Sequence, residues 1–244
     1  MIEKPLASTW ADCLKIYNAS VDNNIKIMPG HIGRFTPAFM AVKKYLTAKP
    51  VGSILSARAT SVSLWKNQDR KPWHLQQKYG GGYLLTLGVH QIDLLCAMIP
   101  AKVVKVYAKL QNSFHKDNID DCGSAILEFG NGVVANIQLV GYQIGKKKVE
   151  TELFYERGMI KISFSEGGFY SDAEHWSLLP GSNPPDWLEQ GLVNEWTSFK
   201  KMLEGDMDVE IRLGQAMHVM ELIFAIFSSS QLGRAVDIDA SDYN

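Results

Sequence analysis

The run Gly80-Gly81-Gly82-Tyr83-Leu84-Leu85-Thr86-Leu87-Gly88-Val89-His90-Gln91-Ile92-Asp93-Leu94-Leu95 joins three consecutive glycines to an apolar segment of helical periodicity. Thr86, His90 and Asp93 are spaced i, i+4 and i+7, which places them on one face of the predicted helix. A hydroxyl, an imidazole and a carboxylate on that face indicate one of two things. The helix either lines a site or lies in the core with a hydrogen-bonded histidine.

The segments around this helix have the character of strands and further helices. Asn131-Gly132, between two apolar runs, is a strong signal for a β-hairpin. Short connections of this kind favour antiparallel pairing. The predicted strands are 53–64, 103–110, 123–129, 133–140, 148–155, 159–164 and 169–177, and the predicted helices are 10–21, 37–46, 80–98, 187–204 and 212–232.

Residues 1–29 follow a different pattern from the rest of the chain. The extended segment Glu3-Lys4-Pro5, a helix over 10–21 and a short strand over 25–28 form one strand–helix–strand unit, which is typical of parallel α/β sheets. One such unit cannot stand alone. The predicted fold is therefore a partial α/β fragment followed by an α+β domain over 30–244, with an open, mainly antiparallel sheet and flanking helices.

Composition excludes several classes of partner. The 244 residues include 25 Lys plus Arg and 26 Asp plus Glu, so the formal net charge is −1, which argues against nucleic acid or an anionic membrane as the main partner. Cys13, Cys96 and Cys122 are an odd number without paired spacing, which favours a reduced, cytoplasmic protein. No apolar run reaches transmembrane length, and the N-terminus does not have the pattern of a signal peptide.

The ordered set of motifs resembles the glucose–fructose oxidoreductase / inositol dehydrogenase / MocA family. The resemblance is carried by Glu3-Lys4-Pro5 before a helix, by Met28-Pro29-Gly30-His31-Ile32-Gly33-Arg34-Phe35, and by the glycine run leading to His90 and Asp93. The ending, with Asn194-Glu195 and Gly233-Arg234-Ala235-Val236-Asp237, is also similar. The resemblance covers essentially the whole chain in the same order.

This resemblance implies a Rossmann domain that binds NAD or NADP, represented here by residues 1–29, and a substrate-binding and oligomerisation domain over 30–244. The implied reaction is hydride transfer at a hydroxyl of a sugar, an inositol or a nucleotide sugar. Lys4 and His90 would be the catalytic residues, because imidazole suits proton transfer near neutral pH and a lysine cation stabilises an alkoxide. The implied cofactor contacts are Glu3, Lys4 and Pro5, and the candidate substrate contacts are His31, Arg34, Trp73, Thr86 and Asp93.

Four of the candidate substrate contacts have an alternative interpretation. His31 and Arg34 could be solvated turn residues, Trp73 could pack under a loop, and Asp93 could cap the helix or form a salt bridge. Adjacent Asp120 and Asp121 would point to opposite sides of a strand, and the remaining histidines form no ligand spacing, so we expect no metal site.

Two departures from the family pattern bear on activity. No Gly-x-Gly-x-x-Gly segment opens a helix after a strand, and Thr86 stands where many family members carry aspartate. Three functions stay open: an oxidoreductase lacking most of its nucleotide-binding domain, a non-catalytic oligomerisation or sugar-binding module, and a half-enzyme completed by another chain. We expect no tight NAD(P) binding by this chain alone. We also expect a homo-oligomer that forms through the sheet. The apolar face of helix 212–232 and residues 1–29 would lack a covering domain, so the chain should self-associate or be poorly stable.

Overall fold

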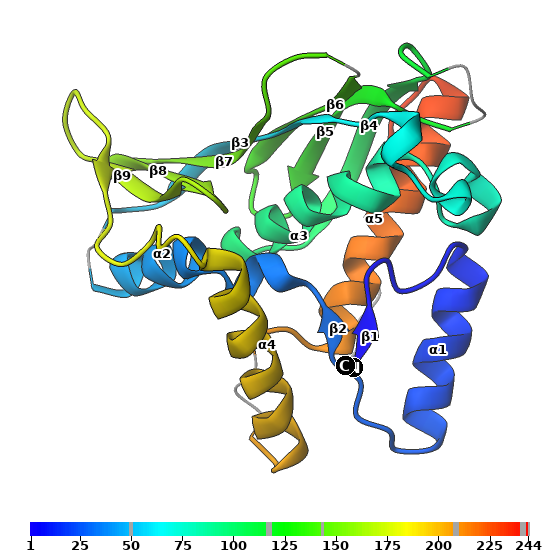
Figure 1. Ribbon diagram of the computed structural model, residues 1–244, viewed down its shortest axis with the longest axis horizontal. Coiled ribbons are helices and arrows are strands. Elements are labelled where there is room, and N and C mark those ends of the chain that lie inside the picture. The colour runs from blue at the N-terminus through cyan, green and yellow to red at the C-terminus, as the bar shows by residue number, and fades with distance from the viewer. Residues whose placement is uncertain (49–50, 116–118, 143, 207–209, 240–242, 244) are drawn as a thin grey trace.

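The computed structural model describes residues 1–48, 51–115, 119–142, 144–206, 210–239 and 243, and its main feature is one large sheet with helices on one face (Figure 1). The strands are β1 (Ile2–Glu3), β2 (Pro29–Gly30), β3 (Ile54–Leu64), β4 (Val103–Gln111), β5 (Cys122–Phe129), β6 (Val134–Tyr142), β7 (Lys148–Tyr155), β8 (Gly158–Ser163), β9 (Gly167–Ser171), β10 (Ser177–Leu178) and β11 (Val236–Asp237). The α-helices are α1 (Trp10–Asp22), α2 (Pro37–Ala48), α3 (Val89–Met98), α4 (Trp187–Leu203) and α5 (Leu213–Leu232).

The large sheet has nine strands in the order β10-β9-β8-β7-β3-β6-β5-β4-β11. Every neighbouring pair is antiparallel except β3 and β6, which are parallel. Alternate residues point to opposite faces, so Val106 and Ala108 are buried beneath the helices while Tyr107 between them is exposed. The predicted open, mainly antiparallel α+β fold is confirmed.

The hairpin between β5 and β6 forms where Asn131-Gly132 predicts it. Gly132 has φ +85°, a left-handed conformation that glycine adopts without steric cost. The Phe129 amide donates to the Val133 carbonyl at 2.9 Å and closes the turn. The Asn131-Gly132 pair therefore predicted the hairpin between β5 and β6 correctly.

The N-terminal unit differs from its prediction in one strand. The strand predicted over 25–28 is wrong: β2 lies at Pro29–Gly30 and pairs in parallel with β1, in the register Ile2 to Pro29 and Glu3 to Gly30. Ile25, which the apolar pattern placed in the strand, is 54% exposed. Pairing with β1, rather than local apolarity, sets the position of β2.

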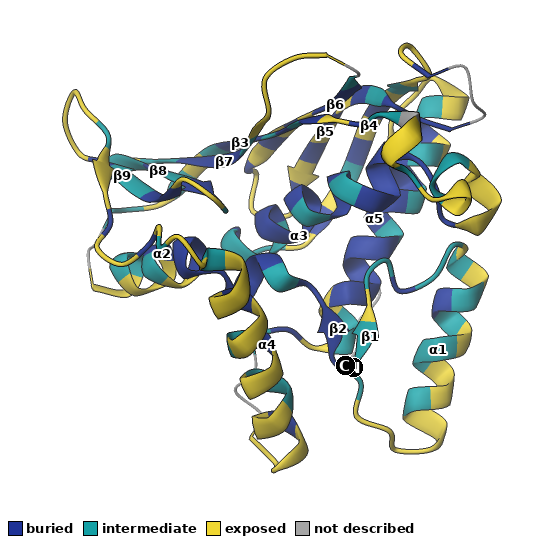
Figure 2. Ribbon diagram, viewed as in Figure 1, coloured by how far each residue is buried: buried dark blue, intermediate teal, exposed yellow. Residues whose placement is uncertain are grey.

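The expected uncovered face of the last helix is also wrong. Helix α5 packs against β4, α1 and α3, and its apolar residues are buried along most of its length (Figure 2). Trp10 of α1 lies against Phe224 of α5, with ring centroids 6.3 Å apart. The N-terminal helix therefore supplies the cover that the sequence pattern left unassigned.

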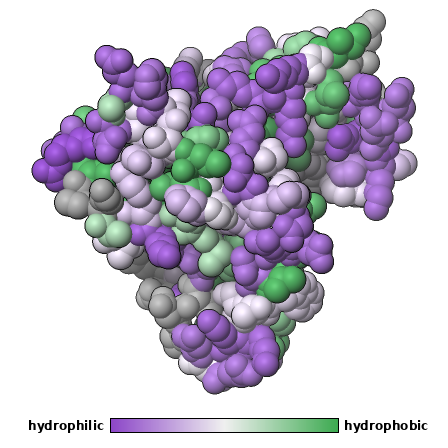
Figure 3. Space-filling model, turned by 60° about the vertical axis from the view of Figure 1, so that its left-hand side comes forward, coloured by the Kyte–Doolittle hydropathy of each residue, from purple (hydrophilic) through white to green (hydrophobic). Residues whose placement is uncertain are grey.

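The outer surface is mixed in character. In the face shown in Figure 3, hydrophilic side chains predominate and hydrophobic ones form small separate groups. Among the described helices, none is both long enough and apolar enough to cross a lipid bilayer.

Candidate active site

Two parallel strands end side by side and place the first two site residues. Lys4 directly follows β1 and His31 directly follows β2, so both lie at the carboxyl ends of neighbouring parallel strands. Ligands of open α/β sheets bind at such ends. The Lys4 amino group donates a hydrogen bond of 2.5 Å to the backbone carbonyl of Thr86, which joins this strand end to the glycine-led helix.

The Thr86 carbonyl that accepts from Lys4 belongs to a π-helical turn. Residues Leu84–Gly88 form this turn ahead of α3, and the Val89 amide reaches back five residues to the Leu84 carbonyl. A π turn offsets the regular hydrogen-bonding pattern, and such turns are frequent at functional sites. The Thr86 hydroxyl donates to the Gly82 carbonyl at 2.5 Å, so its carbonyl, not its side chain, holds Lys4.

Asp120, which sequence reasoning considered only as a metal ligand, holds the start of this turn. Its carboxylate accepts from the Leu84 amide at 2.7 Å, and its carbonyl accepts from the Tyr83 amide at 2.9 Å. Gly82 has φ +101°, and a Cβ there would overlap the Asp120 carboxylate. Burial raises the pKa of Asp120 to about 6. No local pattern links residues 36 positions apart, so the sequence carried no signal for this contact.

His90 is a neutral imidazole at physiological pH. Burial, followed by the electrostatic effect of Lys4 and then of His31, lowers its pKa to about 3, and Asp93 opposes this only in part. Its Nδ1 atom is buried without a hydrogen-bond partner among the described residues. The ring meets Phe164 edge-on at 6.3 Å. Buried polar atoms without a partner are uncommon in folded proteins, so this ring nitrogen is a candidate to contact a bound molecule.

Lys4 titrates closer to neutrality than an ordinary lysine. Burial lowers the pKa of its amino group from 10.5 to about 8, and the neighbouring Glu3 carboxylate acts in the opposite direction. Lys4 and His90 lie within electrostatic reach of each other, because the lysine charge acts on the imidazole. The structure thus brings the two predicted catalytic residues together.

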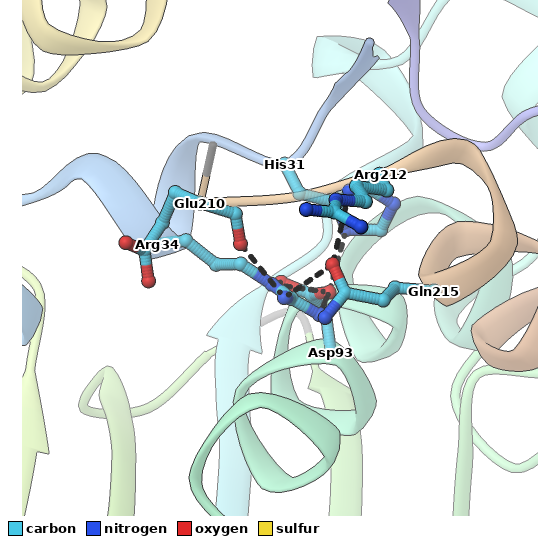
Figure 4. A network of polar contacts seen from close by, with 6 residues as sticks. All are labelled: His31, Arg34, Asp93, Glu210, Arg212 and Gln215. Carbon is cyan, nitrogen blue, oxygen red and sulfur yellow. Dashed lines mark hydrogen bonds and ion pairs between the residues drawn. The ribbon is translucent and has the colours of Figure 1, made fainter. Parts of the chain in front are cut away.

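His31, Arg34 and Asp93 form a buried polar network (Figure 4). The Arg34 guanidinium donates to Asp93 at 2.7, 3.0 and 3.1 Å, and the His31 Nδ1 atom lies 3.3 Å from the same carboxylate. Arg34 also donates to the Glu210 carbonyl at 3.1 Å. His31 is 1% and Arg34 2% exposed, so the interpretation as solvated turn residues is wrong.

The charge state of this network is fixed by its own contacts. Burial would raise the pKa of Asp93, but the charges of Arg34 and His31 outweigh it and hold the pKa below its ordinary value. Asp93 therefore forms the salt bridge that the sequence offered as one alternative.

Trp73 is 39% exposed and stacks on His74 with ring centroids 3.7 Å apart. None of the ring contacts or hydrogen bonds found in the described residues joins Trp73 to Lys4 or His90. Its neighbour His74 does lie within reach of the Lys4 charge.

Glu195 is a buried acid that belongs to the family-like ending of the sequence but has no predicted role. It is 2% exposed, and its Oε1 atom has no hydrogen-bond partner among the described residues. Burial, and then the nearby Glu3 carboxylate, raise its pKa to about 7. Helix α4 thus contributes a second titratable group beside the end of β1.

The residues fit one end of a nicotinamide dinucleotide. Lys4 and the unpartnered His90 nitrogen are suited to the reacting end, where a hydroxyl exchanges its proton. The glycine run at 80–82 is packed against loop residues and Asp120 rather than forming an open phosphate cradle. Within the described residues, no three His, Cys, Asp or Glu side chains are grouped as metal ligands would be.

Comparison with known proteins places this architecture in a family. Residues 39–161 match the model of the GFO/IDH/MocA C-terminal domain. The chain belongs to the GFO/IDH/MocA oxidoreductase family, and the predicted resemblance is confirmed.

Individual relatives by sequence are dehydrogenases and a hydratase. The chain is 37% identical over 95 residues to levoglucosan dehydrogenase of Pseudarthrobacter phenanthrenivorans, covering 38% of this chain and 24% of that protein. It is 30% identical over 141 residues to 2,7-anhydro-N-acetylneuraminate hydratase of Escherichia coli, covering 56% of this chain and 37% of that protein. It is 24% identical over 170 residues to 1-carboxy-3-chloro-3,4-dihydroxycyclo hexa-1,5-diene dehydrogenase of Comamonas testosteroni, covering 64% of this chain and 43% of that protein. The chain thus matches less than half the length of each of these relatives.

Solved structures agree on the fold. Levoglucosan dehydrogenase in complex with NADH and levoglucosan superposes with a TM-score of 0.84 at 22% identity, covering 98% of this chain and 74% of that one. The WlbA dehydrogenase of Bordetella pertussis, in complex with NADH and UDP-GlcNAcA, superposes with a TM-score of 0.78 at 18% identity, covering 97% of this chain and 71% of that one.

Proposed function

We propose that this chain is the substrate-binding part of a cytoplasmic NAD- or NADP-dependent oxidoreductase that acts on a hydroxyl of a sugar, an inositol or a nucleotide sugar. The observation that carries the proposal is the Lys4–Thr86 hydrogen bond, which holds a partly buried amino group within electrostatic reach of the His90 imidazole. Residues 1–29 would belong to a Rossmann-type nucleotide-binding domain, and residues 30–244 would form the substrate domain. The parallel β1–β2 pair with α1 supports this division.

In this proposal the two site residues divide the proton chemistry. Lys4, with a pKa near 8, can exchange a proton close to neutral pH, and its cationic form stabilises a developing alkoxide. His90 is too weakly basic to hold the proton and would pass it on. A bound nicotinamide would accept the hydride from the substrate carbon. Such a proton-transfer residue typically contributes about 10²- to 10⁴-fold to the rate.

The remaining predicted contacts take supporting positions in the same proposal. We assign Arg34 and Asp93 to holding α3 in place, because they form a buried ion pair. Their further polar contacts go to the Glu210 carbonyl and to His31. His31 borders both that pair and His90 and remains a candidate to touch substrate. Glu3 and Pro5 flank Lys4 where the cofactor would lie.

Saturation-transfer NMR with myo-inositol and D-glucose tests the proposal without requiring turnover. We expect the wild-type chain to bind one of these polyols, Lys4→Met to lose the binding, and the exposed-lysine control Lys44→Met to retain it. Equal loss of binding in both variants would contradict the proposal, and so would failure of every sugar and polyol tested, charged ones included, to bind. NADH fluorescence titration should show no saturation at micromolar cofactor. Polyol binding that survives Lys4→Met would instead favour a non-catalytic sugar-binding module.

A further inference from the structure

Segment 65–79 carries a local excess of positive charge beside the candidate site. Its sequence, Trp65 to Tyr79, contains the four cationic residues Lys66, Arg70, Lys71 and Lys78 and only one acid, Asp69, although the whole chain has a formal net charge of −1. Nothing in the proposed hydride transfer requires this concentration of charge.

Hydrogen bonds fix the segment against the start of the catalytic helix. The Gly82 amide donates to the His74 carbonyl at 2.9 Å, and the Gly81 amide donates to the Gln76 carbonyl at 3.1 Å. A Cβ at Gly81 would overlap the His74 carbonyl, so the two backbones are in direct contact. The segment therefore adjoins the turn whose Thr86 carbonyl holds Lys4.

Three cations lie within electrostatic reach of the His74 imidazole. Burial, and then the positive charges of Arg70, Lys71 and Lys4, lower the pKa of His74, while the hydrogen bond from the Lys71 amide opposes this shift. The His74 Nδ1 atom accepts from the Lys71 amide at 3.0 Å, so the ring is held in place. Lys4 and segment 65–79 thus both contribute positive charge near His74, and we refer to them together as the positively charged wall.

The same wall offers an aromatic surface and an unsatisfied donor. Trp73 stacks on His74 and leaves 39% of its area exposed. The Arg70 guanidinium lies 4.5 Å above the Trp65 ring, its buried Nε has no hydrogen-bond partner among the described residues, and Nη2 donates a long 3.4 Å bond to the Leu64 carbonyl. An arginine fork held on an aromatic face is suited to binding a carboxylate.

We propose that the substrate is a sugar acid, whose carboxylate binds Arg70 and whose ring packs on Trp73. The inference rests on the proposed function, and narrows it from polyols in general to carboxylate-bearing ones. A carboxylate would compensate the positive charge of the wall, whereas a neutral sugar would not. A planar carboxylate can accept two parallel hydrogen bonds from the guanidinium, so the fork favours a carboxylate over a lone hydroxyl.

The test is a comparison of dissociation constants for D-glucuronate, D-glucose and D-glucose 6-phosphate by calorimetry or saturation-transfer NMR. We expect D-glucuronate to bind about tenfold or more tightly than D-glucose, as suits one charge-assisted contact. Arg70→Gln should abolish this preference, and Arg70→Lys should restore part of it. Arg157→Gln, an exposed arginine in the turn between β7 and β8, is the matched control and should keep the preference.

Each other outcome has a defined meaning. Equal affinity for D-glucose and D-glucuronate, or tighter binding of D-glucose 6-phosphate, would overturn the sugar-acid inference and leave the proposed function standing. Equal weakening by Arg70→Gln and Arg157→Gln would show general charge attraction and would also overturn it. Failure of all three sugars and of myo-inositol to bind would overturn both proposals. Circular dichroism of Arg70→Gln should match that of the wild type, and Arg70→Lys keeps the test valid if the glutamine variant does not fold.

Discussion

Lys4 combines a buried amino group with a carbonyl partner rather than a carboxylate. A lysine in a buried carboxylate pair would keep its charge at high pH, whereas burial beside the Thr86 carbonyl lowers the pKa of Lys4 to about 8. Resemblance, not spacing, singled out Lys4 in the sequence, because a lone lysine after a short strand has no distinguishing pattern. His90 was visible from its place on an apolar helix face.

The shifted pKa of Lys4 predicts how stability depends on pH. The unfolded chain binds more protons than the folded one between about pH 8 and pH 10.5, so the free energy of unfolding should rise with pH across that window. Lys4→Met removes the effect. At pH 7 we expect Lys4→Met to be more stable than wild type by about 1–3 kcal/mol, an advantage that shrinks toward pH 10.

Urea unfolding followed by circular dichroism between pH 7 and pH 10 measures this difference. Thr86→Val is the control, because it removes the hydroxyl bond to Gly82 but keeps the carbonyl that holds Lys4. It should lose about 1 kcal/mol at every pH and follow the wild-type pH profile. A constant stability gap between Lys4→Met and wild type would show that Lys4 is not buried as a cation.

At the scale of elements, the sequence predicted what depends on local periodicity. The other alternating strands, the Asn131-Gly132 hairpin and the helices over 187–204 and 212–232 appear within a few residues of their predicted bounds. The strand predicted over 169–177 is wrong, because β9 ends at Ser171 and the separate strand β10 covers only Ser177–Leu178. The π turn at Leu84–Gly88 was not predicted, because it shifts the hydrogen bonds without changing the apolar pattern. The position of β2 was wrong because β1 sets its register.

The π turn depends on Gly82, which predicts an asymmetry between two glycine substitutions. Gly82 and Gly132 both have positive φ, but a Cβ at Gly82 would overlap the Asp120 carboxylate while a Cβ at Gly132 meets no atom within 4 Å. We expect Gly132→Ala to cost about 1 kcal/mol and Gly82→Ala about 3 kcal/mol or more. Denaturant unfolding of the two variants measures both values, and equal costs would argue against the Asp120 contact.

At the scale of the whole molecule, none of the described helices covers the second face of the large sheet. Figure 1 shows α2, α3 and α5 on one side of the nine strands. The other side carries apolar residues beside polar ones: Tyr107 and Ile126 are cross-strand partners and are 48% and 39% exposed. The edge strands β10 and β11 have two residues each, so they offer little for edge-to-edge pairing. Association, if it uses the sheet, should therefore be face to face.

We predict that copies of this chain associate through this open sheet face. A stable interface needs about 800 Å² from each partner, which several strands of the face can supply and an isolated helix stripe cannot. Ile126→Asp would place a charge at the centre of the contact and should shift the protein toward monomer by tenfold or more in dissociation constant. Val193→Asp, at a 59% exposed site on α4, is the control and should leave association unchanged. Sedimentation velocity over a concentration series measures both variants; a monomeric wild type, or disruption by Val193→Asp alone, would assign the open face no part in assembly.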